Sequence, residues 1–107
     1  MSNVVTNEQG EVAVLVSHGY GAGWYSWNTG IPDCLFEPRI VRAVQDGDTM
    51  KAAEIADVLW PDGYWGGASG LTIYWLSPGI AFRISEYDGS ESLVEADRQD
   101  WVTVPAP

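Results

Sequence analysis

The sequence predicts an α+β domain: an antiparallel β-meander with a central pair of short helices packed on one face. Three observations predict it: an apolar, β-branched run near the N-terminus, a central stretch with helical periodicity, and two-residue alternation after residue 70. The chain has 107 residues, of which 46% are hydrophobic, enough to bury a core without a disulfide or metal. No internal repeat or long linker divides it, so a single domain is expected over residues 1–107.

The N-terminal third is expected to hold one strand and one long loop. Residues 1–10 are polar and predict a loose lead-in, whereas the apolar run over residues 12–17 predicts a buried strand. A loop rich in glycine and aromatic residues is expected over residues 18–30. Residues 31–36 fit a short strand or a helical turn.

Residues 38–60 predict two short helices. Pro38 suits the first turn of the first helix, and Gly47 is typical of a helix end. Asp48 fits the N-cap of a second helix that begins one residue later. The glycine-rich residues 63–70 that follow predict a flexible connection.

The β-meander is expected over residues 71–104. Residues 77–79, Ser-Pro-Gly, predict a turn that joins a first strand to a hairpin partner beginning near Ile80. The Asp-Gly pair at 88–89 predicts a second reversal. Residues 101–104 fit a last short strand, ended by proline.

Charge and cysteine content limit the classes of function. Fifteen acidic against five basic residues give a net charge of −10, which argues against direct nucleic-acid binding and favours a basic partner. The same charge also fits a simple role in solubility. Cys34 is the single cysteine, so no internal disulfide forms, and no metal or cofactor is expected. The N-terminus has no basic region before an apolar one, and no apolar run approaches the ~18 residues of a membrane span, so a cytoplasmic protein without a membrane partner is expected.

The loop over residues 18–30 is the leading candidate binding site. Its Gly19-x-Gly21-x-Gly23 pattern fails the dinucleotide fingerprint because Trp24 occupies the sixth position, and no phosphate-binding P-loop pattern is present. Glycines allow close approach, and aromatic rings offer large apolar faces with a polar edge. We therefore expect the indoles of Trp24 and Trp27 to lie where a partner or a flat ligand can reach them; the alternative is a loop folded onto its own domain. The candidate residues are His18, Tyr20, Trp24, Tyr25, Trp27 and Asn28.

A second candidate group surrounds the Asp-Gly turn. Its acidic and aromatic residues predict a negative face with aromatic anchors, or alternatively a solvated edge that prevents strand aggregation. The group comprises Glu86, Tyr87, Asp88 and Glu91. A hydrolase built on these carboxylates has no second supporting motif, and nothing in the spacing requires a nucleophilic pair of Cys34 with His18, so a non-enzymatic role is favoured.

The chain carries three notable segments: Gly-Tyr-Gly-Ala-Gly-Trp at 19–24, Trp27-Asn28, and Glu-Tyr-Asp-Gly-Ser-Glu at 86–91. Together they resemble an uncharacterised family of small acidic proteins encoded by tailed bacteriophages. The resemblance extends from the first strand to about residue 94. It implies expression in the cytoplasm of an infected bacterium. By analogy it also implies an accessory protein that binds and inhibits or modulates a host or defence component, of the anti-CRISPR or counter-defence type.

The implied target is a host or defence protein, which could itself bind nucleic acid, and self-association into a homo-oligomer remains open. Two alternatives stand beside this expectation. One is a small-molecule or nucleotide-binding, signal-sequestering protein that uses the loop over residues 18–30. The other is the small hydrolase.

Overall fold

The computed structural model describes residues 4–95 and confirms the α+β class. Its strands are β1 (Val12–Ser17), β2 (Leu71–Leu76), β3 (Phe82–Tyr87) and β4 (Ser90–Glu95), and its helices are α1 (Pro38–Gln45) and α2 (Thr49–Leu59). Three short 3-10 helices connect them: η1 (Tyr25–Trp27), η2 (Pro32–Leu35) and η3 (Gly66–Gly70). Within residues 4–95, none of the helices has the length and apolar character needed to cross a bilayer.

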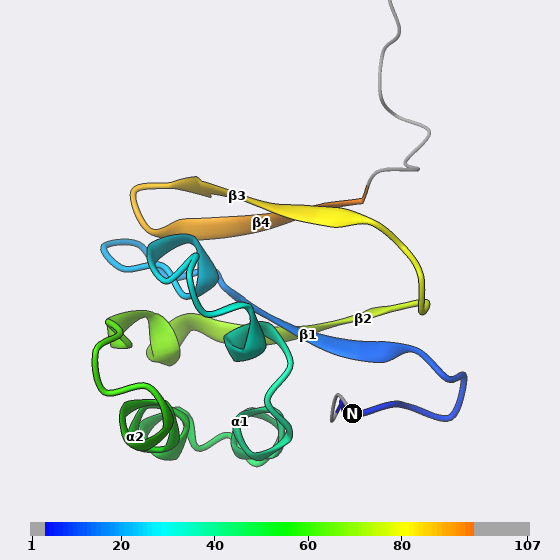
Figure 1. Ribbon diagram of the computed structural model, residues 1–107, viewed down its shortest axis with the longest axis horizontal. Helices are drawn as coiled ribbons and strands as arrows, with labels where there is room; N and C mark the ends of the chain where they lie inside the picture. Colours follow the sequence, from blue (N-terminus) through cyan, green and yellow to red (C-terminus); the bar gives the residue numbers. More distant parts are fainter. Residues whose placement is uncertain (1–3, 96–107) are drawn as a thin grey trace, which may run out of the picture.

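The described chain forms three layers, with the β1–β2 ribbon between the β3–β4 hairpin and the two helices (Figure 1). Strand β1 is buried on both faces. Ala13 and Leu15 belong to the core shared with the helices, whereas Val14 and Val16 pack under the hairpin. This double burial explains why β1 is a continuous apolar run rather than an alternating one.

Strand pairing differs from the expected meander. Strand β2 pairs with β1 in antiparallel register, with Ser17 opposite Leu71, and β3 pairs with β4 alone. Residues 77–79 do form a turn, closed by a hydrogen bond from the Ile80 N–H to the Ser77 carbonyl at 3.2 Å, but the chain then leaves the first sheet. Strand β3 does not pair with β2 but starts a second sheet with β4, whose apolar side chains pack against Val14 and Val16 of β1. The last strand expected at residues 101–104 lies outside the described residues.

The two helices lie where the sequence predicts them. Pro38 begins α1, Gly47 follows it with a φ of 75°, and the Asp48 side chain caps α2 by accepting a hydrogen bond from the Lys51 N–H at 3.0 Å. Residues 31–36 contain the helical turn η2 rather than a strand. The connection expected to be flexible contains η3, in which Gly67 and Ala68 are buried, so it is a packed element.

Candidate functional site

A buried carboxylate joins the glycine-rich loop to the hairpin. Glu91 of β4 has no exposed surface. Its Oε1 accepts a hydrogen bond from the Ser17 N–H at 3.0 Å, and its Oε2 accepts from the Trp24 N–H at 2.7 Å, the Ser26 N–H at 2.9 Å and the Ser26 hydroxyl at 2.6 Å. Four donors offset the cost of burying the charge. The prediction that Glu91 belongs to an exposed acidic face is therefore wrong. Glu91 is a buried residue that anchors the loop to the hairpin.

Trp24 is sealed inside the domain, so the expectation that its indole is accessible is wrong. Its side chain is 0% exposed, its Nε1–H donates to the Cys34 carbonyl at 2.7 Å, and its ring lies 4.8 Å from that of Trp65. The physical reason is the Glu91 anchor, which draws the Trp24 backbone inward. Trp24 is a core residue of the loop.

Asn28 is buried and connects the loop to a segment distant in sequence. Its Nδ2 donates to the Trp24 carbonyl at 2.7 Å and to the Tyr64 carbonyl at 2.9 Å, and its Oδ1 accepts from the Tyr64 N–H at 2.9 Å. Asn28 therefore positions Tyr64 rather than offering its amide to a partner. Tyr64 was not among the candidates from sequence, although an aromatic pair, Tyr64-Trp65, inside a glycine-rich segment was a signal that could have identified it.

Trp27 keeps its indole at the surface beside that tyrosine. The Trp27 side chain is 43% exposed and that of Tyr64 55%, and their ring centroids lie 5.4 Å apart at an interplanar angle of 30°. The Trp27 Nε1–H donates to Glu86 Oε2 at 3.3 Å, and the same oxygen accepts from the Gly89 N–H at 2.6 Å. We call Trp27, Tyr64 and Glu86 the aromatic–acidic face.

The remaining loop and turn candidates divide between surface and core. The Gly21 N–H donates to the Asp88 carbonyl at 2.7 Å, so the tip of the loop touches the hairpin turn. Both tyrosines that precede the contacting residues in sequence, Tyr20 and Tyr87, are exposed. Tyr25 is half-buried and packs both against the core shared with the helices and against the apolar residues under the hairpin. The structure thus brings the two predicted groups together, although not all of their side chains reach the surface.

His18 lies beside the same junction but does not pair with Cys34. Its Nδ1 lies 2.9 Å from the Glu91 carbonyl oxygen and its Nε2 lies 2.9 Å from the Tyr74 hydroxyl. Because a carbonyl only accepts, the neutral ring carries its proton on Nδ1 and accepts from Tyr74 at Nε2. Burial raises the pKa of the Cys34 thiol to about 12, with the negative charges of Glu91 and Asp33 adding to the effect. Cys34 is a core residue and not an activated nucleophile.

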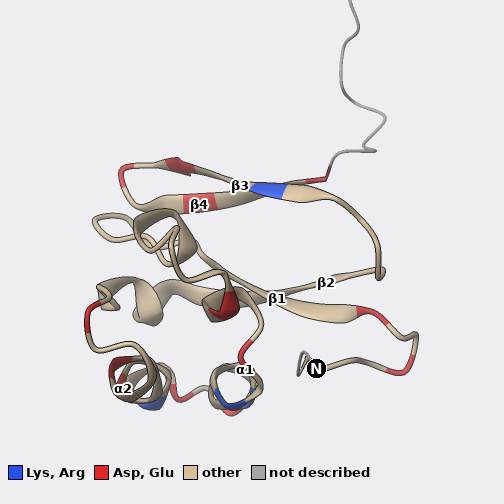
Figure 2. Cartoon of the chain, in the orientation of Figure 1, with Lys and Arg blue, Asp and Glu red and all other residues tan. Residues whose placement is uncertain are grey.

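Segments that hold acidic residues lie at the tip of the hairpin and on β4, and also around the helices and in the N-terminal loop, whereas the hairpin has one basic segment, on β3 (Figure 2). Among residues 4–95, no three His, Cys, Asp or Glu side chains are grouped so that they could hold a metal ion. Comparison of the chain with protein-family models, curated proteins and solved structures finds no match.

Proposed function

We propose that this protein is a non-catalytic binding protein that attaches its aromatic–acidic face to a basic surface of a bacterial host or defence protein. The observation that carries the proposal is the exposed Trp27–Tyr64 pair beside the Glu86 carboxylate. An arginine or lysine of a partner can stack on such rings and pair with the carboxylate at once. Aromatic residues of this kind supply most of the binding energy in protein interfaces.

Rigid support favours binding by this face. Asn28 holds the Tyr64 backbone through two hydrogen bonds, and Glu91 holds the loop immediately before Trp27 through Ser26. Side chains held in place before contact lose less conformational entropy on association. The buried residues of the loop therefore contribute to binding indirectly, by positioning Trp27 and Tyr64.

The net charge of −10 supports a basic partner. A strongly negative surface steers a basic protein during the encounter and raises the association rate, most strongly at low salt. The resemblance to bacteriophage proteins adds the setting that we propose, namely the cytoplasm of an infected bacterium and an inhibitory or modulating role there. A defence protein that handles nucleic acid fits this role because it carries the basic surface that the charge requires.

The test compares Trp27→Ala, Tyr64→Ala and Glu86→Gln with Met50→Ala, which removes an exposed apolar side chain from α2. Each variant is expressed in bacteria that carry one defined defence system at a time, and the plating efficiency of a phage sensitive to that system is measured. Wild type and Met50→Ala should restore phage plating in one of these hosts, whereas the plating efficiency with Trp27→Ala should be at least tenfold lower. For a partner identified in this way, the association rate should fall as NaCl is added. Equal activity of Trp27→Ala and wild type, or equal loss in Met50→Ala, contradicts the proposal.

The same exposed rings favour one alternative, the stacking of a flat ligand such as a nucleotide base. Titration of nucleotides against the purified protein, followed by tryptophan fluorescence and by the midpoint of thermal unfolding, separates the two functions. A saturable change that disappears in Trp27→Ala supports the ligand, and no change supports the protein partner.

A further inference from the structure

The scarce basic residues of this chain gather between the two helices. The chain has five lysines and arginines, and three of them, Arg39, Arg42 and Lys51, line one hollow of about 450 Å³ between α1 and α2. The blue segments of α1 and α2, which mark basic residues, lie on the sides of these helices turned away from the sheets (Figure 2). The other lining residues are Ala43, Asp46 and Ile55. The hollow is thus net positive in a protein whose total charge is −10.

A neighbouring hollow of about 240 Å³ continues the first along α2. The two share Arg39, Lys51 and Ile55, and the second adds an apolar wall of Val58 and Leu59, with Glu54 at its edge. We call the combined feature, defined by Arg39, Arg42, Lys51, Ile55 and Val58, the α1–α2 groove. It has basic side chains from both helices and an apolar wall that includes the exposed Val58.

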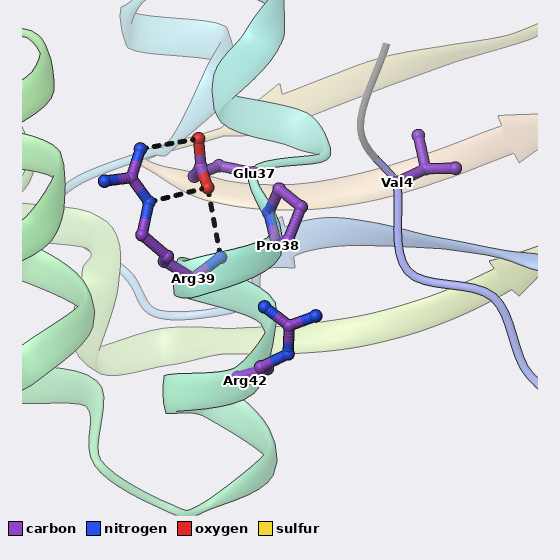
Figure 3. Close-up of a pocket in the computed structure, with 5 residues that line it drawn as sticks. All are labelled: Val4, Glu37, Pro38, Arg39 and Arg42. Carbon is purple, nitrogen blue, oxygen red and sulfur yellow. Dashed lines mark hydrogen bonds and ion pairs between the residues drawn. The ribbon is translucent and has the colours of Figure 1, made fainter.

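Two of the three basic groups in the groove are available to a ligand. Arg39 is held by Glu37, whose carboxylate accepts from its Nε at 3.1 Å, its Nη2 at 3.3 Å and its backbone N–H at 3.0 Å (Figure 3). The side chains of Arg42 and Lys51 make no hydrogen bond or ion pair with any of residues 4–95. The Arg42 side chain is exposed and also borders a hollow beside Val4 (Figure 3).

We propose that the α1–α2 groove binds a small amphipathic anion, that is, a single carboxylate, sulfonate or phosphate group on a compact apolar body. Arg42 and Lys51 hold the anionic end, and Ile55 and Val58 contact the apolar body. The volume of the hollow is within the range of small-molecule sites. Asp46 and Glu54 line the groove as well, and their charges disfavour a ligand with a second anionic group.

The test uses 8-anilinonaphthalene-1-sulfonate, one sulfonate on an apolar body whose fluorescence rises on transfer from water. Titration of the full chain should give a saturable signal for one site, weakened by added NaCl. Arg42→Ala and Lys51→Ala should each reduce the affinity about tenfold. The matched control is Arg83→Ala on β3, which removes the same charge outside the groove and should change the affinity less than twofold. Val58→Ser should weaken the dye without affecting competition by inorganic phosphate.

Three results would overturn the proposal. The first is an equal loss in Arg83→Ala and Arg42→Ala, which would show that only total charge matters. The second is dye binding that none of the groove variants changes. The third is displacement of the dye by inorganic phosphate at a concentration equal to that of the dye, which would show that the apolar wall contributes nothing. Circular dichroism and the thermal midpoint of each variant identify any loss that comes from unfolding.

Discussion

The carboxylate of Glu91 accepts a hydrogen bond from the Trp24 N–H at 2.7 Å, across 67 residues of sequence. This contact makes the glycine-rich loop and the β3–β4 hairpin one unit. Because of this contact, Trp27 and Glu86 lie close together. Trp27 is three residues after Trp24, and Glu86 is five residues before Glu91. The exposed aromatic–acidic face therefore depends on a buried acid, Glu91.

Replacement of Glu91 is expected to destabilise the fold strongly. Alanine leaves the Ser17, Trp24 and Ser26 N–H groups without their acceptor, and each unsatisfied buried donor costs about 1–3 kcal/mol. Glu91→Ala should lower the free energy of unfolding by about 3 kcal/mol or more. Glu91→Gln keeps an acceptor for Trp24 and Ser26 but turns an amide toward the Ser17 N–H, so it should lose less.

Urea unfolding measures both Glu91 variants against Ser92→Ala, which alters the exposed neighbouring residue of β4. The control should stay within about 0.5 kcal/mol of wild type. If Glu91→Ala is as stable as the control, the carboxylate is not the anchor of the loop.

Elements with local signals could be predicted, whereas pairing could not. The apolar run of β1, Pro38 at the start of α1 and Asp48 before α2 are signals that act within a few residues, so these elements could be predicted from the sequence. The turn at residues 77–79 is also local, but whether the strands on either side of it pair depends on contacts with distant parts of the chain. Strand β2 pairs with β1, about 60 residues earlier, and β3 pairs with β4.

The candidate site was predictable in location but not in exposure. Its two groups of residues were identified from glycine, aromatic and acidic content, and the structure places them in contact. Trp24 and Trp27 are equivalent by composition, yet one is sealed and the other is exposed. The difference arises from the bond between Glu91 and the Trp24 backbone, and one acid among fifteen carries no local mark that it is buried. The backbone of Tyr64 is held beside the face by Asn28, 36 residues away in the sequence.

Close backbone approach at Gly67 provides a second prediction. A Cβ added at Gly67 would overlap the Gly23 carbonyl oxygen and lie 2.9 Å from that of Ala22, and neither backbone atom can move aside cheaply. Gly67→Ala should therefore destabilise the protein by about 2 kcal/mol or more. At Gly30 an added Cβ meets nothing within 4 Å, so Gly30→Ala should stay within about 0.5 kcal/mol of wild type. Thermal unfolding compares the two, and similar midpoints would contradict the packing of η3 against the loop.

The cap of α2 provides a third prediction. The Asp48 side chain accepts from the Lys51 N–H at 3.0 Å, which satisfies a free donor of the first turn. Asp48→Ala should cost about 1 kcal/mol, and Asp48→Asn should restore most of it, because asparagine caps nearly as well. Asp57→Ala, an exposed change within the same helix, is the control and should have a smaller effect. Chemical unfolding measures all three, and an equal loss in the Asn and Ala variants would exclude a capping role.

The buried thiol of Cys34 predicts a dependence of stability on alkaline pH. Burial, with smaller effects from Glu91 and Asp33, raises its pKa from 9.0 to about 12. Between these values the unfolded chain loses the thiol proton while the folded chain keeps it, so folding stability falls as pH rises through this window and is unaffected below it. The loss approaches about 1.4 kcal/mol per pH unit. Tyrosine and lysine side chains also ionise there, so the measured quantity is the difference in unfolding free energy between wild type and Cys34→Ala at pH 7, 8.5 and 10. Wild type should decline more steeply above pH 9 and its native thiol should react slowly with a disulfide reagent, whereas parallel curves with rapid labelling would place Cys34 in contact with water.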